Sequence, residues 1–128
     1  MCIDIKNFYL GTPMKYFQYM RIHKKIIPQE VLDGYEIIFD DRDFAYVEIC
    51  RGMYGLKEAG VMAFDQIVRK LKRFGYKPMP QTPGLWIYTS RKTAFTLCVD
   101  YFGIQYFSKS DADHLIDAIQ DTYVSQNV

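Results

Sequence analysis

Apolar and polar positions repeat with two different periods along this chain of 128 residues. From residue 57 to 74, apolar side chains recur at the three- and four-residue spacing of a helix with one buried stripe: Ala63, Phe64, Ile67, Val68, Leu71 and Phe74. A short helix is predicted from Pro28 to about Leu32, and Ser110 is expected to cap a last helix with Asp113 near its third position. Short apolar runs predict strands over residues 2–6, 16–22, 44–50, 85–89, 93–99 and 101–107.

This order of elements predicts an α+β fold, in which a small, mostly antiparallel sheet carries its helices on one face. The length suits a single domain over residues 1–128. Hydrophobic residues make up 49% of the chain and aromatic residues 16%, which excludes a disordered protein. Because the first residues already resemble the middle of a strand, we expect the chain to be a fragment of a larger protein.

The balance of charges and the cysteine spacing indicate which binding partners and which cellular compartment to expect. Sixteen Lys and Arg face fifteen Asp and Glu, so any contact with a polyanion must come from a local basic face. Candidates are Lys24, Lys25, Arg69, Lys70, Lys72 and Arg73, although a solvated helix face is the favoured interpretation of the last four. No apolar run approaches the length of a membrane helix, and Cys2, Cys50 and Cys98 lack CxxC spacing. We therefore expect no membrane partner and an intracellular, cytoplasmic protein.

One acidic residue, Asp100, stands between two apolar runs, and Gly103 follows it closely. Both runs are rich in aromatic and β-branched residues, which favour strands, so the carboxylate is expected at a tight hairpin turn. A carboxylate fixed at such a turn can hold a hard cation such as Mg²⁺. The alternative is that Asp100 only supplies the polar residue that a turn needs.

Three segments in order carry a family resemblance: Asp4-Ile-Lys-Asn-Phe-Tyr-Leu10, Tyr54-Gly-Leu-Lys-Glu-Ala59 and Cys98-Val-Asp-Tyr101. They resemble the reverse transcriptases of retroelements, most closely the RNA-directed DNA polymerases of copia-type retrotransposons. In that family an aspartate precedes an aromatic segment, a YGLKQA-like segment follows, and a hairpin carries a YVDD-like tip. The resemblance covers nearly the whole chain and implies a polymerase palm with part of the fingers and no thumb.

The resemblance implies a magnesium-dependent nucleotidyltransferase. Asp4 and Asp100 match the catalytic carboxylates on two neighbouring strands, and the carbonyl of Ile5 matches a backbone ligand of the metal. Two Mg²⁺ are expected in the family, with Mn²⁺ as a substitute, because nucleotidyl transfer uses one ion at the primer 3′-hydroxyl and one at the triphosphate. Taken alone, Asp4 is equally well a surface residue at a strand end.

Further residues match segments near the nucleotide and the template. Tyr9 matches the aromatic residue under the sugar of the incoming deoxynucleotide, and Gly55 and Glu58 match other nucleotide-binding positions. Matches to template and primer contacts are Tyr54, Leu56, Lys57 and Tyr101. Without the resemblance, Phe8 is a core residue, Gly55 belongs to a strand-to-helix turn, and Trp86 and Tyr88 are sheet core.

Two positions depart from the family pattern. Tyr101 replaces the second hairpin aspartate, and tyrosine is uncharged at neutral pH, so only two carboxylates remain. Glu58 replaces a glutamine, and a like charge about 4 Å from a triphosphate would cost about 4 kcal/mol at an effective dielectric constant of about 20. We therefore expect the isolated chain to be inactive or nearly so.

The expected partners are an RNA or DNA primer–template, a deoxynucleoside triphosphate, and the fingers, thumb and ribonuclease H parts of a polyprotein. The parent element would also reach a virus-like particle or the nucleus. Two alternatives stay open at this point: a non-catalytic module, descended from such a polymerase, that binds nucleic acid or protein, and a decayed reading frame with no selected role.

Overall fold

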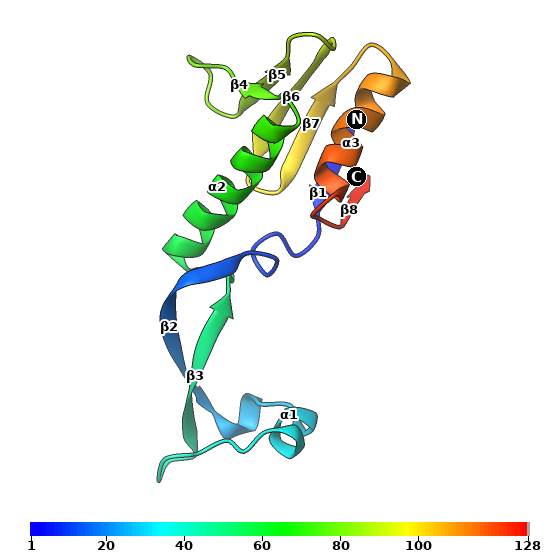
Figure 1. The fold of residues 1–128 in the computed structure, drawn as a ribbon. Helices are drawn as coiled ribbons and strands as arrows, with labels where there is room; N and C mark the ends of the chain where they lie inside the picture. The colour runs from blue at the N-terminus through cyan, green and yellow to red at the C-terminus, as the bar shows by residue number, and fades with distance from the viewer. Residues whose placement is uncertain (128) are drawn as a thin grey trace. The chain divides into compact units, whose positions relative to one another are not determined.

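The structure is a computed structural model that describes residues 1–127, apart from the side chain of Phe17. The chain divides into two compact units. The first contains Met1–Thr12 and the chain from Arg51 onward, and the second contains Pro13–Cys50. Figure 1 traces the chain through both units.

A six-stranded sheet forms the first unit, and every neighbouring pair of its strands is antiparallel. The strand order is β4-β5-β6-β7-β1-β8, so strand β1 lies between β7 and β8 (Figure 1). The strands are β1 (Cys2–Ile5), β4 (Lys77–Pro78), β5 (Leu85–Tyr88), β6 (Thr93–Cys98), β7 (Tyr101–Gln105) and β8 (Ser125–Asn127). This order places the first residues of the chain beside a hairpin formed about a hundred residues later.

Helices α2 (Lys57–Arg73) and α3 (Lys109–Gln120) cover one face of this sheet. Buried and accessible residues alternate along β1, β6 and β7, as expected when only one face of a sheet is covered. The covered face and the helices share a core that includes Ile3, Ile5, Phe8, Ile67, Leu71, Trp86, Phe95, Phe102, Leu115 and Ile119. The opposite face, which we call the open face, carries Cys2, Asp4, Thr96, Cys98, Tyr101, Gly103 and Gln105.

Helix α2 ends in a glycine-dependent cap. Gly75 has a φ of +92°, its N–H donates to the carbonyl of Lys72, and the N–H of Tyr76 donates to the carbonyl of Leu71. These two bonds are those of a Schellman motif, in which glycine adopts the left-handed conformation at little cost. A Cβ atom on Gly75 would also lie 2.7 Å from the Tyr88 ring, so both conformation and space require glycine there.

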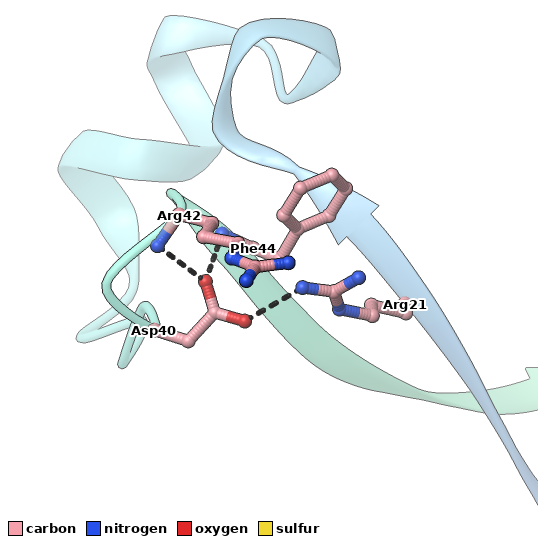
Figure 2. A network of polar contacts seen from close by, with 4 residues as sticks. All are labelled: Arg21, Asp40, Arg42 and Phe44. Atoms are coloured by element: carbon pink, nitrogen blue, oxygen red, sulfur yellow. Dashed lines mark hydrogen bonds and ion pairs between the residues drawn. The ribbon is translucent and has the colours of Figure 1, made fainter.

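The second unit pairs β2 (Pro13–His23) with β3 (Phe44–Arg51) and also contains the 3₁₀ turn η1 (Lys24–Ile26) and helix α1 (Gln29–Gly34). Asp40 organises the turn before β3, as Figure 2 shows. Its Oδ2 atom accepts from Arg21 at 2.8 Å, and its Oδ1 atom accepts from the backbone N–H groups of Arg42 and Phe44, both at 2.9 Å. The Arg21 hydrogen bond, then the Phe44 N–H, lower the pKa of Asp40 to about 2.

The expected α+β class, the antiparallel sheet and the placement of helices on one face are confirmed. Two details are wrong. The cap of α3 is Ser108, not Ser110: its hydroxyl accepts from the N–H of Asp111, because the same Ser-x-x-Asp pattern occurs two residues earlier. Phe64 is 47% exposed, since the buried line of α2 is Ala59, Ala63, Ile67 and Leu71. Strands β4 and β8 were not predicted.

Candidate metal and nucleotide site

A two-residue turn carries Asp100. Strands β6 and β7 pair up to Cys98 and Tyr101, which leaves only Val99 and Asp100 to connect them. Val99 has a φ of +59°, a conformation that β-branched residues rarely adopt, whereas the first central residue of a type II′ hairpin turn requires it. The turn therefore holds a strained residue directly before the carboxylate, and backbone strain of this kind gathers at functional sites.

The sheet brings Asp4 beside this turn. Asp4 pairs with Tyr101, and the N–H of Ile5 donates to the carbonyl of Asp100 at 3.0 Å. Asp4 thus lies on β1, whereas Asp100 lies in the turn directly before the neighbouring strand β7 rather than on a strand, and both residues are partly accessible. The side chain of Ile5 is buried in the core, while a ligand role for its carbonyl stays a prediction.

Tyr101 is the first residue of β7, and its side chain lies on the open face. It is 53% exposed and stands directly across from Asp4, so the two side chains project from the same face. Among residues 1–127, no three His, Cys, Asp or Glu side chains gather in a way that could hold a metal ion. Tyr101 thus lies across from Asp4 at the position where the resemblance predicts a second hairpin aspartate, and this match stays a prediction.

Tyr54 links the glycine-rich segment to the hairpin. Its hydroxyl donates to Oδ2 of Asp100 at 3.3 Å, and its ring meets the Tyr9 ring edge-on at a centroid distance of 4.6 Å. Desolvation first, and then the negative charge of Asp100, raise the pKa of Tyr54, so its hydroxyl stays protonated at neutral pH. Tyr54, Tyr9 and Asp100 therefore form one connected group.

Close main-chain packing holds Tyr9 in this group. A Cβ atom on Gly52 would lie 2.7 Å from the carbonyl oxygen of Tyr9, so the two backbones approach as only glycine allows. The N–H of Thr12 donates to the same carbonyl at 2.9 Å. Phe8, beside Tyr9, is 2% exposed, which confirms its interpretation as a core residue.

The rest of the Tyr54–Ala59 segment forms the start of α2. Gly55 has a φ of +94° and open space around its Cα, so the turn requires glycine and leaves room for a ligand. Leu56 is the N-cap, Lys57 is the first helical residue, and the exposed Glu58 lies in the first turn, where a negative charge suits the helix dipole. The ligand contacts expected of Gly55, Leu56, Lys57 and Glu58 stay predictions.

Gln126 joins the site although the sequence interpretation missed it. It pairs with Asp4 across β1 and β8, and its Nε2 atom donates to Oδ2 of Asp4 at 3.1 Å. The segment Ser-Gln-Asn of β8 has low strand propensity, so no local pattern pointed to a strand there. Only the pairing with β1 reveals the contact.

The donor set suits one hard divalent cation. Asp4 and Asp100 offer carboxylate oxygens, the type of ligand that Mg²⁺ and Mn²⁺ prefer, and Mg²⁺ commonly needs only one or two carboxylates when substrate phosphates and water complete its shell. The two residues therefore fit one such ion together with a nucleotide. A second ion would depend mainly on ligands from the substrate.

Among the basic candidates, Lys70 has a structural role within the first unit. Lys70 bonds to Asp121 and Thr122 with a side chain only 10% exposed, so it fastens the end of α3 to α2 rather than standing on a solvated face. Lys24 and Lys25 belong to η1 of the second unit. Trp86 is 2% exposed, as expected of a core residue.

No family model matches the chain, and neither a curated protein nor a solved structure matches it. Among residues 1–127, no helix is long and apolar enough to cross a membrane. The site must therefore be interpreted from its own geometry.

Proposed function

We propose that the chain is the palm-type region, with part of the fingers, of an RNA-directed DNA polymerase from a copia-type retroelement. The observation that carries this proposal is the pairing of β1 with β7, which sets Asp4 beside the Asp100 hairpin on the open face of the sheet. The contact between Tyr54 and Asp100 supports it further, since it joins two of the three segments that resemble the family.

The proposed reaction is nucleotidyl transfer. The 3′-hydroxyl oxygen of a primer forms a bond to the α-phosphorus of a deoxynucleoside triphosphate, the bond to pyrophosphate breaks, and the hydroxyl proton leaves to solvent or base. When bound, Mg²⁺ or Mn²⁺ supplies Lewis-acid chemistry at the hydroxyl and the triphosphate. Asp4 and Asp100 would hold the cation, and the carbonyl of Ile5 would add a ligand.

Other residues would position the substrates. The Tyr9 ring would lie under the sugar and exclude a 2′-hydroxyl, because its main chain is fixed by the close approach of Gly52. Gly55 and Glu58 would lie near the triphosphate, and the template and primer would pass Tyr54, Leu56, Lys57 and Tyr101. The remaining partners would be the fingers, thumb and ribonuclease H parts of a polyprotein.

Tyr101 should make this region inactive or nearly so, because it removes a carboxylate across from Asp4. Removal of a residue that merely orients the metal ligands costs about 10–100-fold in metal affinity or activity. Removal of a residue that binds the metal directly should cost more. The test is single-nucleotide primer extension with Mg²⁺ and then Mn²⁺. We expect almost no product from the wild-type chain and more from Tyr101→Asp.

Two controls decide the meaning of that assay. The double variant Asp4→Asn with Tyr101→Asp should lose the gained product, whereas Lys109→Gln, at an exposed position of α3, should leave extension unchanged. Extension that survives Asp4→Asn would contradict the assignment of the carboxylates. Processive synthesis by the wild-type chain would contradict the predicted effect of Tyr101.

A second candidate is a non-catalytic module that binds nucleic acid or protein. The observation in its favour is that Tyr101 and Tyr54 are exposed aromatic residues, at 53% and 64%, beside an incomplete set of acids. Aromatic residues of this kind can stack on unpaired bases. Primer–template binding that is independent of metal and survives Asn substitution of Asp4 and Asp100 would favour this candidate.

A further inference from the structure

The carboxylates of Asp4 and Asp100 each accept a hydrogen bond from one uncharged side chain of another part of the fold. Oδ2 of Asp4 accepts from Gln126 Nε2 at 3.1 Å, and Oδ2 of Asp100 accepts from the Tyr54 hydroxyl at 3.3 Å. The Oδ1 atoms of both residues have no hydrogen-bond partner within residues 1–127. One oxygen of each carboxylate is thus occupied, and the other is left for a ligand.

The two donors are fixed by their surroundings. Gln126 faces Asp4 because the two residues are partners in the β1–β8 ladder. The Tyr54 ring contacts the Tyr9 ring edge-on, and Gly52 packs against the main chain of Tyr9. A donor that is already oriented loses little conformational freedom when the carboxylate beside it binds a ligand.

The chemistry of the donors also suits a cation site. An amide N–H and a phenol O–H orient a carboxylate without adding a positive charge that would compete with a metal ion. A lysine or arginine in either place would form an ion pair and neutralise the ligand. Carboxylates that ligate metals are commonly held by such hydrogen bonds from surrounding residues.

We propose that Tyr54 and Gln126 are positioning residues, which orient Asp100 and Asp4 so that their Oδ1 atoms can bind one divalent cation. This inference rests on the metal site of the proposed function and assigns Tyr54 a role separate from the template contact considered above. Gln126 acts through Asp4 and Tyr54 acts through Asp100. Neither residue is assigned as a ligand.

The test measures Mn²⁺ binding to the full chain, without nucleotide, by the electron paramagnetic resonance signal of free Mn²⁺. We expect Tyr54→Phe and Gln126→Leu each to weaken binding by about 10–100-fold, the usual effect of losing such a contact. Melting of both variants without metal should remain close to that of the wild type. A merely structural role would lower the melting temperature and leave the Mn²⁺ affinity unchanged.

The chain offers a matched control for each variant. Tyr19→Phe removes a hydroxyl from a residue that is 65% exposed, much like Tyr54 at 64%, but belongs to the second unit. Gln120→Leu removes a similar bond, from Gln120 Nε2 to Ser125 Oγ at 3.3 Å. Both controls should bind Mn²⁺ as the wild type does.

Two failures can be told apart with Asp4→Asn. If this variant abolishes Mn²⁺ binding but Tyr54→Phe and Gln126→Leu bind as tightly as the wild type or tighter, the positioning role is wrong and the metal site remains. If Mn²⁺ binding is absent in the wild type or unaffected by Asp4→Asn, the metal site itself is wrong, and the positioning role falls with it.

Discussion

Replacement of Tyr101 by aspartate should create a charge repulsion that a divalent cation removes. The backbone geometry gives the distance. Ile5 and Asp100 form a hydrogen-bonded position of the β1–β7 ladder, so the next pair, Asp4 and Tyr101, is a non-hydrogen-bonded one. The Cβ atoms of such a pair lie about 4.5–5.5 Å apart, which places two carboxylates at a separation of about 5 Å.

Coulomb's law then bounds the cost. Two like charges about 5 Å apart repel by about 0.8 kcal/mol in water and by about 3.3 kcal/mol at an effective dielectric constant of about 20. Because Tyr101 is 53% exposed, the lower part of this range applies, about 1 kcal/mol. Tyr101→Asn is the matched control, since asparagine has the same shape as aspartate and the variant loses the same aromatic ring without adding a charge.

The assay is urea unfolding at neutral pH with and without Mn²⁺. Without metal, Tyr101→Asp should be about 1 kcal/mol less stable than Tyr101→Asn. With free Mn²⁺ at about 100 times the dissociation constant of Tyr101→Asp, that variant gains about 2.7 kcal/mol, whereas Tyr101→Asn, with one carboxylate fewer, binds Mn²⁺ more weakly and gains less, so the order of the two variants should reverse. Equal stability of the two variants under both conditions would refute the predicted proximity of residue 101 to Asp4.

Three further predictions concern the fold. Ser108→Ala should lower the unfolding free energy by about 1 kcal/mol, as loss of a helix cap usually does, whereas Ser110→Ala should change it by no more than about 0.5 kcal/mol. Urea unfolding that ranks the two variants the other way would contradict the assigned cap. Gly75→Ala should destabilise by about 1–3 kcal/mol in the same assay, because its φ is +92° and an added Cβ would lie 2.7 Å from an aromatic ring of β5, and unchanged stability would contradict this. Since the pKa of Asp40 is lowered from 3.8 to about 2, its contribution to stability should be complete above about pH 4 and lost as pH falls through about 2. A carboxyl titration by NMR should show the lowered pKa, and this pKa should return toward 3.8 in Arg21→Leu.

Local patterns predicted most of the first unit because they agree with its packing. The stripe of α2, the run that became β6 and the turn at Asp100 each follow a period that a core on one face imposes. The same logic failed for β8, where Ser-Gln-Asn becomes a strand only through its pairing with β1. Tertiary pairing overrides weak β propensity in such cases.

The candidate site likewise contains residues that the sequence indicated and residues that it did not. The hairpin pattern made Asp100 a candidate and the family resemblance added Asp4, and the ladder between β1 and β7 brings Asp4 beside the turn that carries Asp100. Gln126 had no signal in the sequence, since a polar residue in a polar segment carries no pattern. The Tyr54 bond to Asp100 could not be foreseen either, because it depends on how the turn before α2 meets the hairpin. A single domain over residues 1–128 stays a prediction.

The most direct test of the metal site is the broadening of backbone amide NMR signals by substoichiometric Mn²⁺. Signals of residues 4, 5 and 99–101 should broaden first, together with that of Gln126, because these residues surround Asp4 and Asp100. The effect should disappear in the double variant Asp4→Asn with Asp100→Asn. Broadening that centres elsewhere, for instance on the acidic first turns of α3, or that persists in the double variant, would contradict the account.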